Sequence, residues 1–184
     1  MTNHELLDLL RCEVVPAIGC TEPIAVALCV ARAKEKLGAK PDKILVQLSK
    51  NVYKNALAVG IPNTGMTGLP IAIALGATVG RSEYMLEVLR DATPEAVAYA
   101  KEYMLRVPAD IQIKYDAPSM LYIHAEVVCG DKKAEATIQD GHTNFVGEDG
   151  EMVNGAETVK QLDGEDGKSG EVLTLKRVYD FALE

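Results

Sequence analysis

Apolar residues recur at helical spacing along several stretches of the chain. The longest stretch begins at Thr21, which we expect to be the helix N-cap, and ends at Leu37, just before Gly38. Its first half is apolar on nearly every side, which predicts burial. Further helices are predicted over residues 3–11, over Tyr84–Arg90 behind a Ser82 cap, from Thr93-Pro94-Glu95 to about Val107, and from about Glu171 to Glu184.

Apolar and polar positions alternate in two other regions, and this pattern predicts strands. One strand is expected from Lys43 to about Val52. Residues 110–138 should form further strands, including an antiparallel hairpin that turns at Gly130-Asp131. A short strand including Phe145 and Val146 follows. The fold class is therefore α+β, with buried helices packed on a mainly antiparallel sheet.

Three other segments complete the organisation of the chain. Residues 60–70 contain three glycines and two prolines and should form an irregular loop that leads into the apolar run Ile71–Val79. The polar, glycine-rich segment 163–170 reads as a linker. We therefore expect one substrate-facing domain over residues 1–162, the linker, and over 171–184 the start of a helix that leads to a C-terminal domain absent from this chain.

Composition narrows the class of protein. The 184 residues include no tryptophan and two phenylalanines, so the core should be aliphatic. The net charge is −8, and no basic stripe with interleaved aromatic residues is present, which argues against a nucleic-acid partner. No apolar run approaches the roughly 20 residues of a membrane span, and the N-terminus does not resemble a secretion signal. We expect a cytoplasmic protein.

Cys20 is the candidate reactive residue. It follows Gly19 and precedes Thr21-Glu22-Pro23, a typical helix start. Unpaired N–H groups and the helix dipole favour a thiolate there, which predicts a pKa below the ordinary value of about 8.5. Burial as an inert packing residue is the alternative. The four cysteines show neither a C-x-x-C pair nor zinc-type spacing, so we expect free thiols.

Polar residues gather in three short clusters, each at the end of a predicted element. A glycine-rich loop that leads into a helix can present N–H groups to an anion, and a nearby lysine adds charge. Read singly, each cluster has an alternative as ordinary turn chemistry. The clusters are Cys20-Thr21-Glu22; Asn51, Lys54 and Asn55 with Asn63-Thr64-Gly65; and His142-Thr143-Asn144.

Taken together and in this order, the three motifs resemble the L-cysteine desulfidase family. The runs that carry the resemblance are Glu13–Ala25, Asn51–Gly65 and His142–Asn144, so it spans nearly the whole chain. That family is related to the iron-sulfur L-serine dehydratases, and the chain is similar to the N-terminal portion of its members. The resemblance implies a lyase of amino-acid catabolism that removes sulfide from L-cysteine, or water from L-serine, giving pyruvate and ammonia.

The resemblance also implies roles for residues and a cofactor. Cys20 would be the base that takes the α-proton, and the other residues of the three clusters would bind the amino acid. A 4Fe-4S cluster would act on the leaving group in place of pyridoxal phosphate. Its ligands in the family lie in a helical C-terminal half that this chain lacks, and Cys12, Cys29 and Cys129 match none of them.

We therefore expect no metal ligand, no cluster and no lyase activity in this chain alone. The expected partner is a C-terminal helical domain or a separate subunit, and a homo-oligomer is compatible with the sequence. Two other classes remain open: a non-catalytic module that binds and senses an amino acid, and a structural assembly domain. Loss of turnover on replacing Cys20 would separate the enzyme from the sensor.

Overall fold

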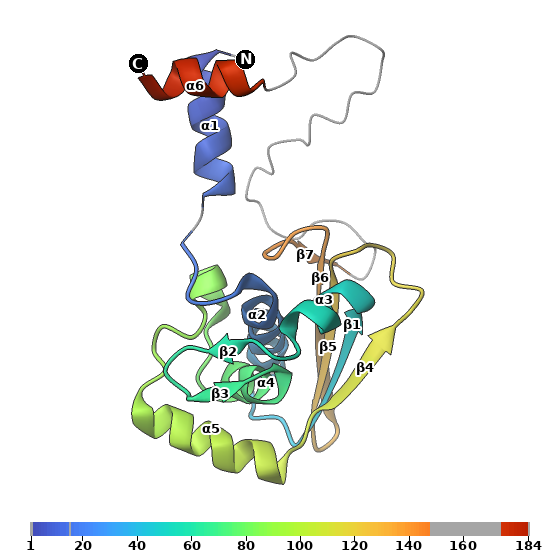
Figure 1. Cartoon of the computed structure of the whole chain (residues 1–184). Helices are drawn as coiled ribbons and strands as arrows, with labels where there is room; N and C mark the ends of the chain where they lie inside the picture. The colour runs from blue at the N-terminus through green and yellow to red at the C-terminus, as the bar shows by residue number, and fades with distance from the viewer. Residues whose placement is uncertain (1, 15, 148–173, 184) are drawn as a thin grey trace. The chain divides into compact units, whose positions relative to one another are not determined.

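The computed structural model describes residues 2–14, 16–147 and 174–183, which fall into two compact units. The smaller unit contains the terminal helices α1 (Asn3–Glu13) and α6 (Leu175–Leu183) (Figure 1). Thr2 and Glu5 form a capping box at the start of α1. The linker predicted over 163–170 and the boundary at 162 lie outside the described residues.

A five-stranded sheet forms one layer of the larger unit in the described part of the chain. Its strand order is β4-β1-β5-β6-β7, and only the β1–β4 pair is parallel. This confirms the predicted α+β class with a mainly antiparallel sheet, including the hairpin that turns at Gly130-Asp131. The strands are β1 (Lys43–Ser49), β4 (Asp110–Lys114), β5 (Tyr122–Cys129), β6 (Lys132–Gln139) and β7 (Phe145–Val146).

Helix α2 (Thr21–Leu37) packs across one face of this sheet, against β5 and β6 (Figure 1). Its middle is fully buried, and the Cys29 thiol donates hydrogen bonds to backbone carbonyls of both strands. The helix ends as predicted at Gly38, whose φ of 67° lies in the left-handed region. α2 is therefore the element around which the core is built.

Helix α4 (Leu69–Thr78) packs against α2, and α5 (Pro94–Arg106) packs against α4 (Figure 1). The α2–α4 approach is close at Gly76, where an added Cβ would lie 2.4 Å from the carbonyl oxygen of Ala27. Only glycine fits this position without a backbone shift. α5 begins after the Thr93 cap, as the sequence predicts.

The segment after β1 differs from its prediction. β1 stops at Ser49, because the Ser49 hydroxyl accepts a hydrogen bond from the backbone N–H of Val52 and starts helix α3 (Lys50–Ala56). Residues 60–70, predicted to be irregular, contain a small hairpin of β2 (Gly60–Ile61) and β3 (Met66–Thr67).

The predicted helix over Tyr84–Arg90 is also wrong. Residues Ser82–Glu87 instead form a short 3-10 helix, η1, which Met85 interrupts with a φ of 48°. Ser82 does not cap it, because its backbone N–H and its hydroxyl both donate to the Glu35 carboxylate on α2. None of the helices in the described ranges is both long and apolar enough to cross a membrane.

Candidate functional site

The candidate reactive residue, Cys20, lies at the start of helix α2, where the N-cap is one residue earlier than the sequence predicts. Cys20 is the N-cap, with extended backbone, and Thr21 is the first helical residue rather than the cap. The turn that leads in depends on Gly19, whose φ is 90°. A Cβ on Gly19 would also lie 2.8 Å from Cγ of Pro62, so the entry to α2 packs against the β2–β3 loop.

The carboxylate of Glu22 is the centre of this site. The Cys20 thiol and the Thr21 hydroxyl both donate to Oε2, each at 3.2 Å. The side-chain amide of Asn55 donates to Oε1 at 3.1 Å. The structure thus joins the first predicted cluster to a residue of the second that lies 33 positions further along the chain.

The two acidic groups of the site are shifted in opposite directions. Burial and the hydrogen bond to Glu22 raise the pKa of the Cys20 thiol, and the backbone N–H groups of Glu22 and Thr21 only partly offset this. The predicted lowering of the Cys20 pKa is therefore wrong. Burial alone would raise the pKa of Glu22, but hydrogen bonds from Cys20, its own backbone, Asn55 and Thr21 lower it.

Within the described residues, no hydrogen bond joins the rest of the second cluster to Glu22. Asn51 and Lys54 are exposed on α3, a helix rather than the predicted strand end. The Thr64 hydroxyl is buried and holds the β2–β3 turn, donating to Ile61 and accepting from Met66. Thr64 therefore shapes the loop from within. Its neighbours Asn63 and Gly65 are exposed and have positive φ, at 63° and 64°.

The third cluster lies in the connection between β6 and β7. His142, Thr143 and Asn144 are all half-buried there. The backbone of Asn144 accepts a hydrogen bond from the N–H of Gln139 and donates one to the carbonyl of Gly141. Nε2 of His142 is buried without a hydrogen-bond partner among the described residues. No hydrogen bond joins His142 or Asn144 to Glu22 or Cys20 within the described ranges.

The described thiols do not fit a 4Fe-4S cluster. Three thiolates would have to converge, yet a rise of about 1.5 Å per residue places Cys20 and Cys29 about 13 Å apart along α2. Burial raises the pKa of Cys29 to about 12. No described group of three metal-ligating side chains includes a thiol. The side chain of Cys12 lies outside the described part of the chain.

One group of chemically capable residues escaped the sequence analysis. His124, Glu126 and Glu135 converge on the sheet face opposite α2. The sequence contains a pattern that predicts this group. Residues two apart in a strand share a face, so His124 and Glu126 lie together. The Gly130-Asp131 turn fixes the hairpin register that sets Glu126 opposite Glu135.

Comparison with known proteins finds relatives of greater length. The chain is 52% identical to a UPF0597 protein of Bacteroides fragilis over 98% of its own length and 42% of the relative's. UPF0597 proteins of Bacteroides thetaiotaomicron and Photobacterium profundum are 51% and 41% identical, each again covered over 42%. No family model and no solved structure matches. The chain is thus similar to somewhat less than half of each of these UPF0597 proteins.

Proposed function

We propose that this chain is the substrate-facing part of an iron-sulfur-dependent lyase that eliminates sulfide from L-cysteine, or water from L-serine. The resemblance of its three motifs to the L-cysteine desulfidase family supports the proposal. The observation that carries it is the Glu22 carboxylate, which brings Cys20 of the first motif together with Asn55 of the second. These are the two motifs that the resemblance assigns to proton abstraction and substrate binding.

The α-ammonium group of the amino acid is the natural partner of Glu22. Glu22 is ionised, and among the described residues its oxygens accept hydrogen bonds from neutral donors alone. An ammonium group would form a stronger, charge-assisted hydrogen bond with it. The exposed ammonium group of Lys54 on α3 is suited to the substrate carboxylate.

This binding mode would also activate Cys20. The hydrogen bond from Cys20 to Glu22 raises the thiol pKa, so a substrate that occupies Glu22 removes that contribution and adds a positive charge nearby. The thiolate that forms would take the α-proton, and loss of the β-substituent would give an enamine that hydrolyses to pyruvate and ammonia. Cys20 would thus become a base only when the amino acid is bound.

The proposed lyase needs more than this chain. The described thiols do not fit a cluster, so its ligands would come from the remaining length that the relatives possess. A C-terminal domain or a partner subunit would supply them. No step at the leaving group is assigned to residues of this chain.

The test is pyruvate formation from L-cysteine and L-serine by a protein that joins this chain to the remaining length. The variant Cys20→Ser should lower kcat by about 100-fold or more, because the proton acceptor is lost. Cys129→Ser, which removes a half-buried thiol at the end of β5, is the matched control and should keep full activity. Equal activity of the two variants would end the base assignment.

Binding separates the enzyme from an amino-acid sensor. Calorimetry on this chain should detect L-serine but not D-serine, and Glu22→Gln should weaken binding because the ammonium partner is lost. A sensor would bind L-serine in the wild type and in Cys20→Ser alike, with no turnover in the joined protein. No binding of any amino acid would favour a structural role.

A further inference from the structure

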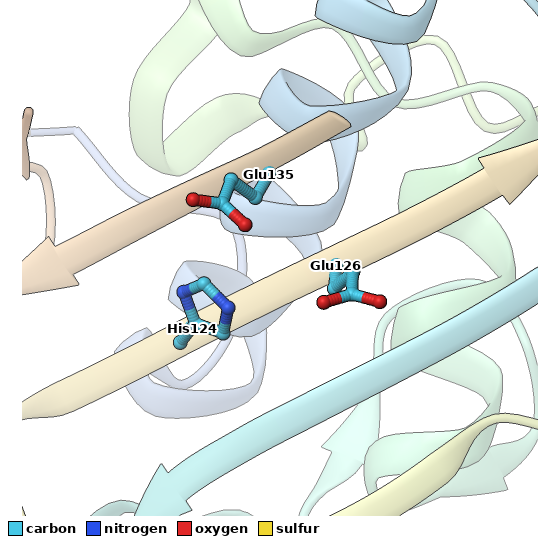
Figure 2. A group of neighbouring side chains, drawn as sticks. All are labelled: His124, Glu126 and Glu135. Atoms are coloured by element: carbon cyan, nitrogen blue, oxygen red, sulfur yellow. The ribbon is translucent and has the colours of Figure 1, made fainter. Parts of the chain in front are cut away.

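The sheet face opposite α2 carries a cluster of ionisable side chains. Ile123, Ala125 and Val127 of β5 are fully buried toward the core, so His124 and Glu126 stand on the other face. Figure 2 shows both of them beside Glu135 of β6, with helices behind the strands. All three side chains are half-buried.

The strand register places two carboxylates of like charge next to each other. Glu126 and Glu135 are directly opposite each other in the antiparallel β5–β6 pair. Like charges in directly opposed positions destabilise a sheet unless a cation lies between them. The pair of carboxylates therefore favours any cation that can reach both.

We propose that His124, Glu126 and Glu135 form a three-ligand site for a divalent transition-metal ion, for which Zn²⁺ is the matched probe. One imidazole nitrogen and two carboxylate oxygens are a donor set that zinc accepts, with a fourth position left for water. Mg²⁺ and Ca²⁺ prefer sites made of oxygen ligands alone and in larger number. The mixed donor set thus selects the transition metal.

The ligand atoms are close to binding geometry. One atom from each of the three side chains lies within 4.8 Å of the others. A tetrahedral ion held at about 2.0–2.2 Å from each ligand needs the ligand atoms about 3.3–3.6 Å apart. Rotations about side-chain bonds would close that difference, while the paired strands β5 and β6 keep the three backbones in place.

The ring of His124 has a hydrogen-bond partner across the β5–β6 pair. Its Nδ1 is 3.0 Å from the Thr137 hydroxyl, the residue opposite it on β6. With the proton on Nδ1, this hydrogen bond orients the ring and leaves the lone pair of Nε2 for an ion.

Lys133 forms ion pairs with both carboxylates of the cluster. Its ammonium nitrogen is 2.7 Å from a Glu126 oxygen and 3.8 Å from a Glu135 oxygen. The side chain is about half exposed, at 53%, so it can swing into solvent when a divalent ion arrives. Lys133 is therefore a competitor, and its removal should strengthen metal binding.

The experiment is calorimetric titration of this chain with Zn²⁺, after alkylation of accessible thiols with iodoacetamide. We expect one ion per chain, binding weakened by about 100-fold or more in His124→Gln, Glu126→Gln and Glu135→Gln, and stronger binding in Lys133→Met. Thr137→Val should weaken binding by about tenfold. His4→Ala and Glu83→Gln, at exposed positions elsewhere, are the controls and should bind as the wild type does.

Several results would overturn the proposal. The absence of saturable binding in both the wild type and Lys133→Met would show that the cluster is a plain ion-pair network. Wild-type affinity in His124→Gln would place the ion elsewhere. Co²⁺ gives a thiolate charge-transfer band when sulfur is a ligand. That band in the alkylated protein would assign binding to a cysteine. Circular dichroism of each variant confirms that lost binding is not lost folding.

Discussion

Two thiols on one helix, Cys20 at the start of α2 and Cys29 in its middle, illustrate how surroundings set reactivity. Cys29 is fully buried, donates to two backbone carbonyls, and has a pKa raised to about 12. Cys20 is partly exposed and donates to a carboxylate. Both pKa values are raised, but only the one at Cys20 depends on a partner that a bound cation could occupy. The thiol in the middle of α2 is therefore inert, whereas the pKa of the thiol at its start can change when a cation binds Glu22.

The largest effect on stability is expected where α4 packs against the middle of α2. Gly76→Ala should destabilise the protein by about 2–3 kcal/mol, because the new methyl group would meet the Ala27 carbonyl of α2. Urea unfolding measures this. Gly60→Ala is the matched control, since no atom lies within 4 Å of its added Cβ. Equal stability of the two variants would show that α4 does not confine α2.

The second prediction compares the two thiols directly. At pH 8 iodoacetamide should modify Cys20 about 100-fold faster than Cys29, since Cys29 has neither access nor thiolate. Peptide mass spectrometry over a time course gives both rates in one sample. Similar rates would mean that α2 opens readily, and the contrast between its start and middle would disappear.

Glu22→Gln should lower the pKa of the Cys20 thiol, which is the direction expected from the helix dipole. The neutral amide carries no charge to repel a thiolate, so the pKa of Cys20 should fall and its alkylation at pH 7.5 should become severalfold faster. Rates measured across pH give the pKa. Glu83→Gln, at an exposed surface carboxylate, should change nothing. An unchanged Cys20 profile in Glu22→Gln would show that burial alone raises the pKa.

The smallest effect concerns stability in acid. The pKa of Glu22 is lowered in the folded state, so its contribution is present above the unfolded value of 4.5 and is lost as the pH falls through the lower folded value. Between about pH 5 and pH 3 the wild type should lose more unfolding free energy than Glu22→Gln. Because Glu22 is partly exposed, the difference should stay below about 1 kcal/mol. Denaturant titrations at several pH values test this.

The sequence predicts those structural features that depend on residues close together in the chain. The end of α2 at Gly38, the Thr93 cap of α5 and the β5–β6 hairpin all follow from local turn and cap chemistry. The strand predicted to reach about Val52 ends at Ser49, because the Ser49 hydroxyl caps a helix there. Alternation alone does not report a competing cap.

The sequence suggests residues for the candidate site but does not reveal its electrostatics. Cys20, Glu22 and Asn55 were all identified, yet the direction of the Cys20 pKa depends on how the Glu22 side chain folds back onto the thiol. The bond from Asn55 to Glu22 joins two segments that only the tertiary structure brings together. Side-chain conformation and long-range contacts leave no periodic signal in a single sequence.

The position of β1 in the sheet has a consequence for synthesis on the ribosome. β1 lies between β4 and β5, and its Gln47 pairs with Gln112, 65 residues further along. At about 5–20 residues per second, β1 leaves the ribosome roughly 3–13 seconds before its first neighbour does. During that interval the apolar side of β1 has no sheet to join, so slower elongation within residues 50–109 should increase the demand for chaperones.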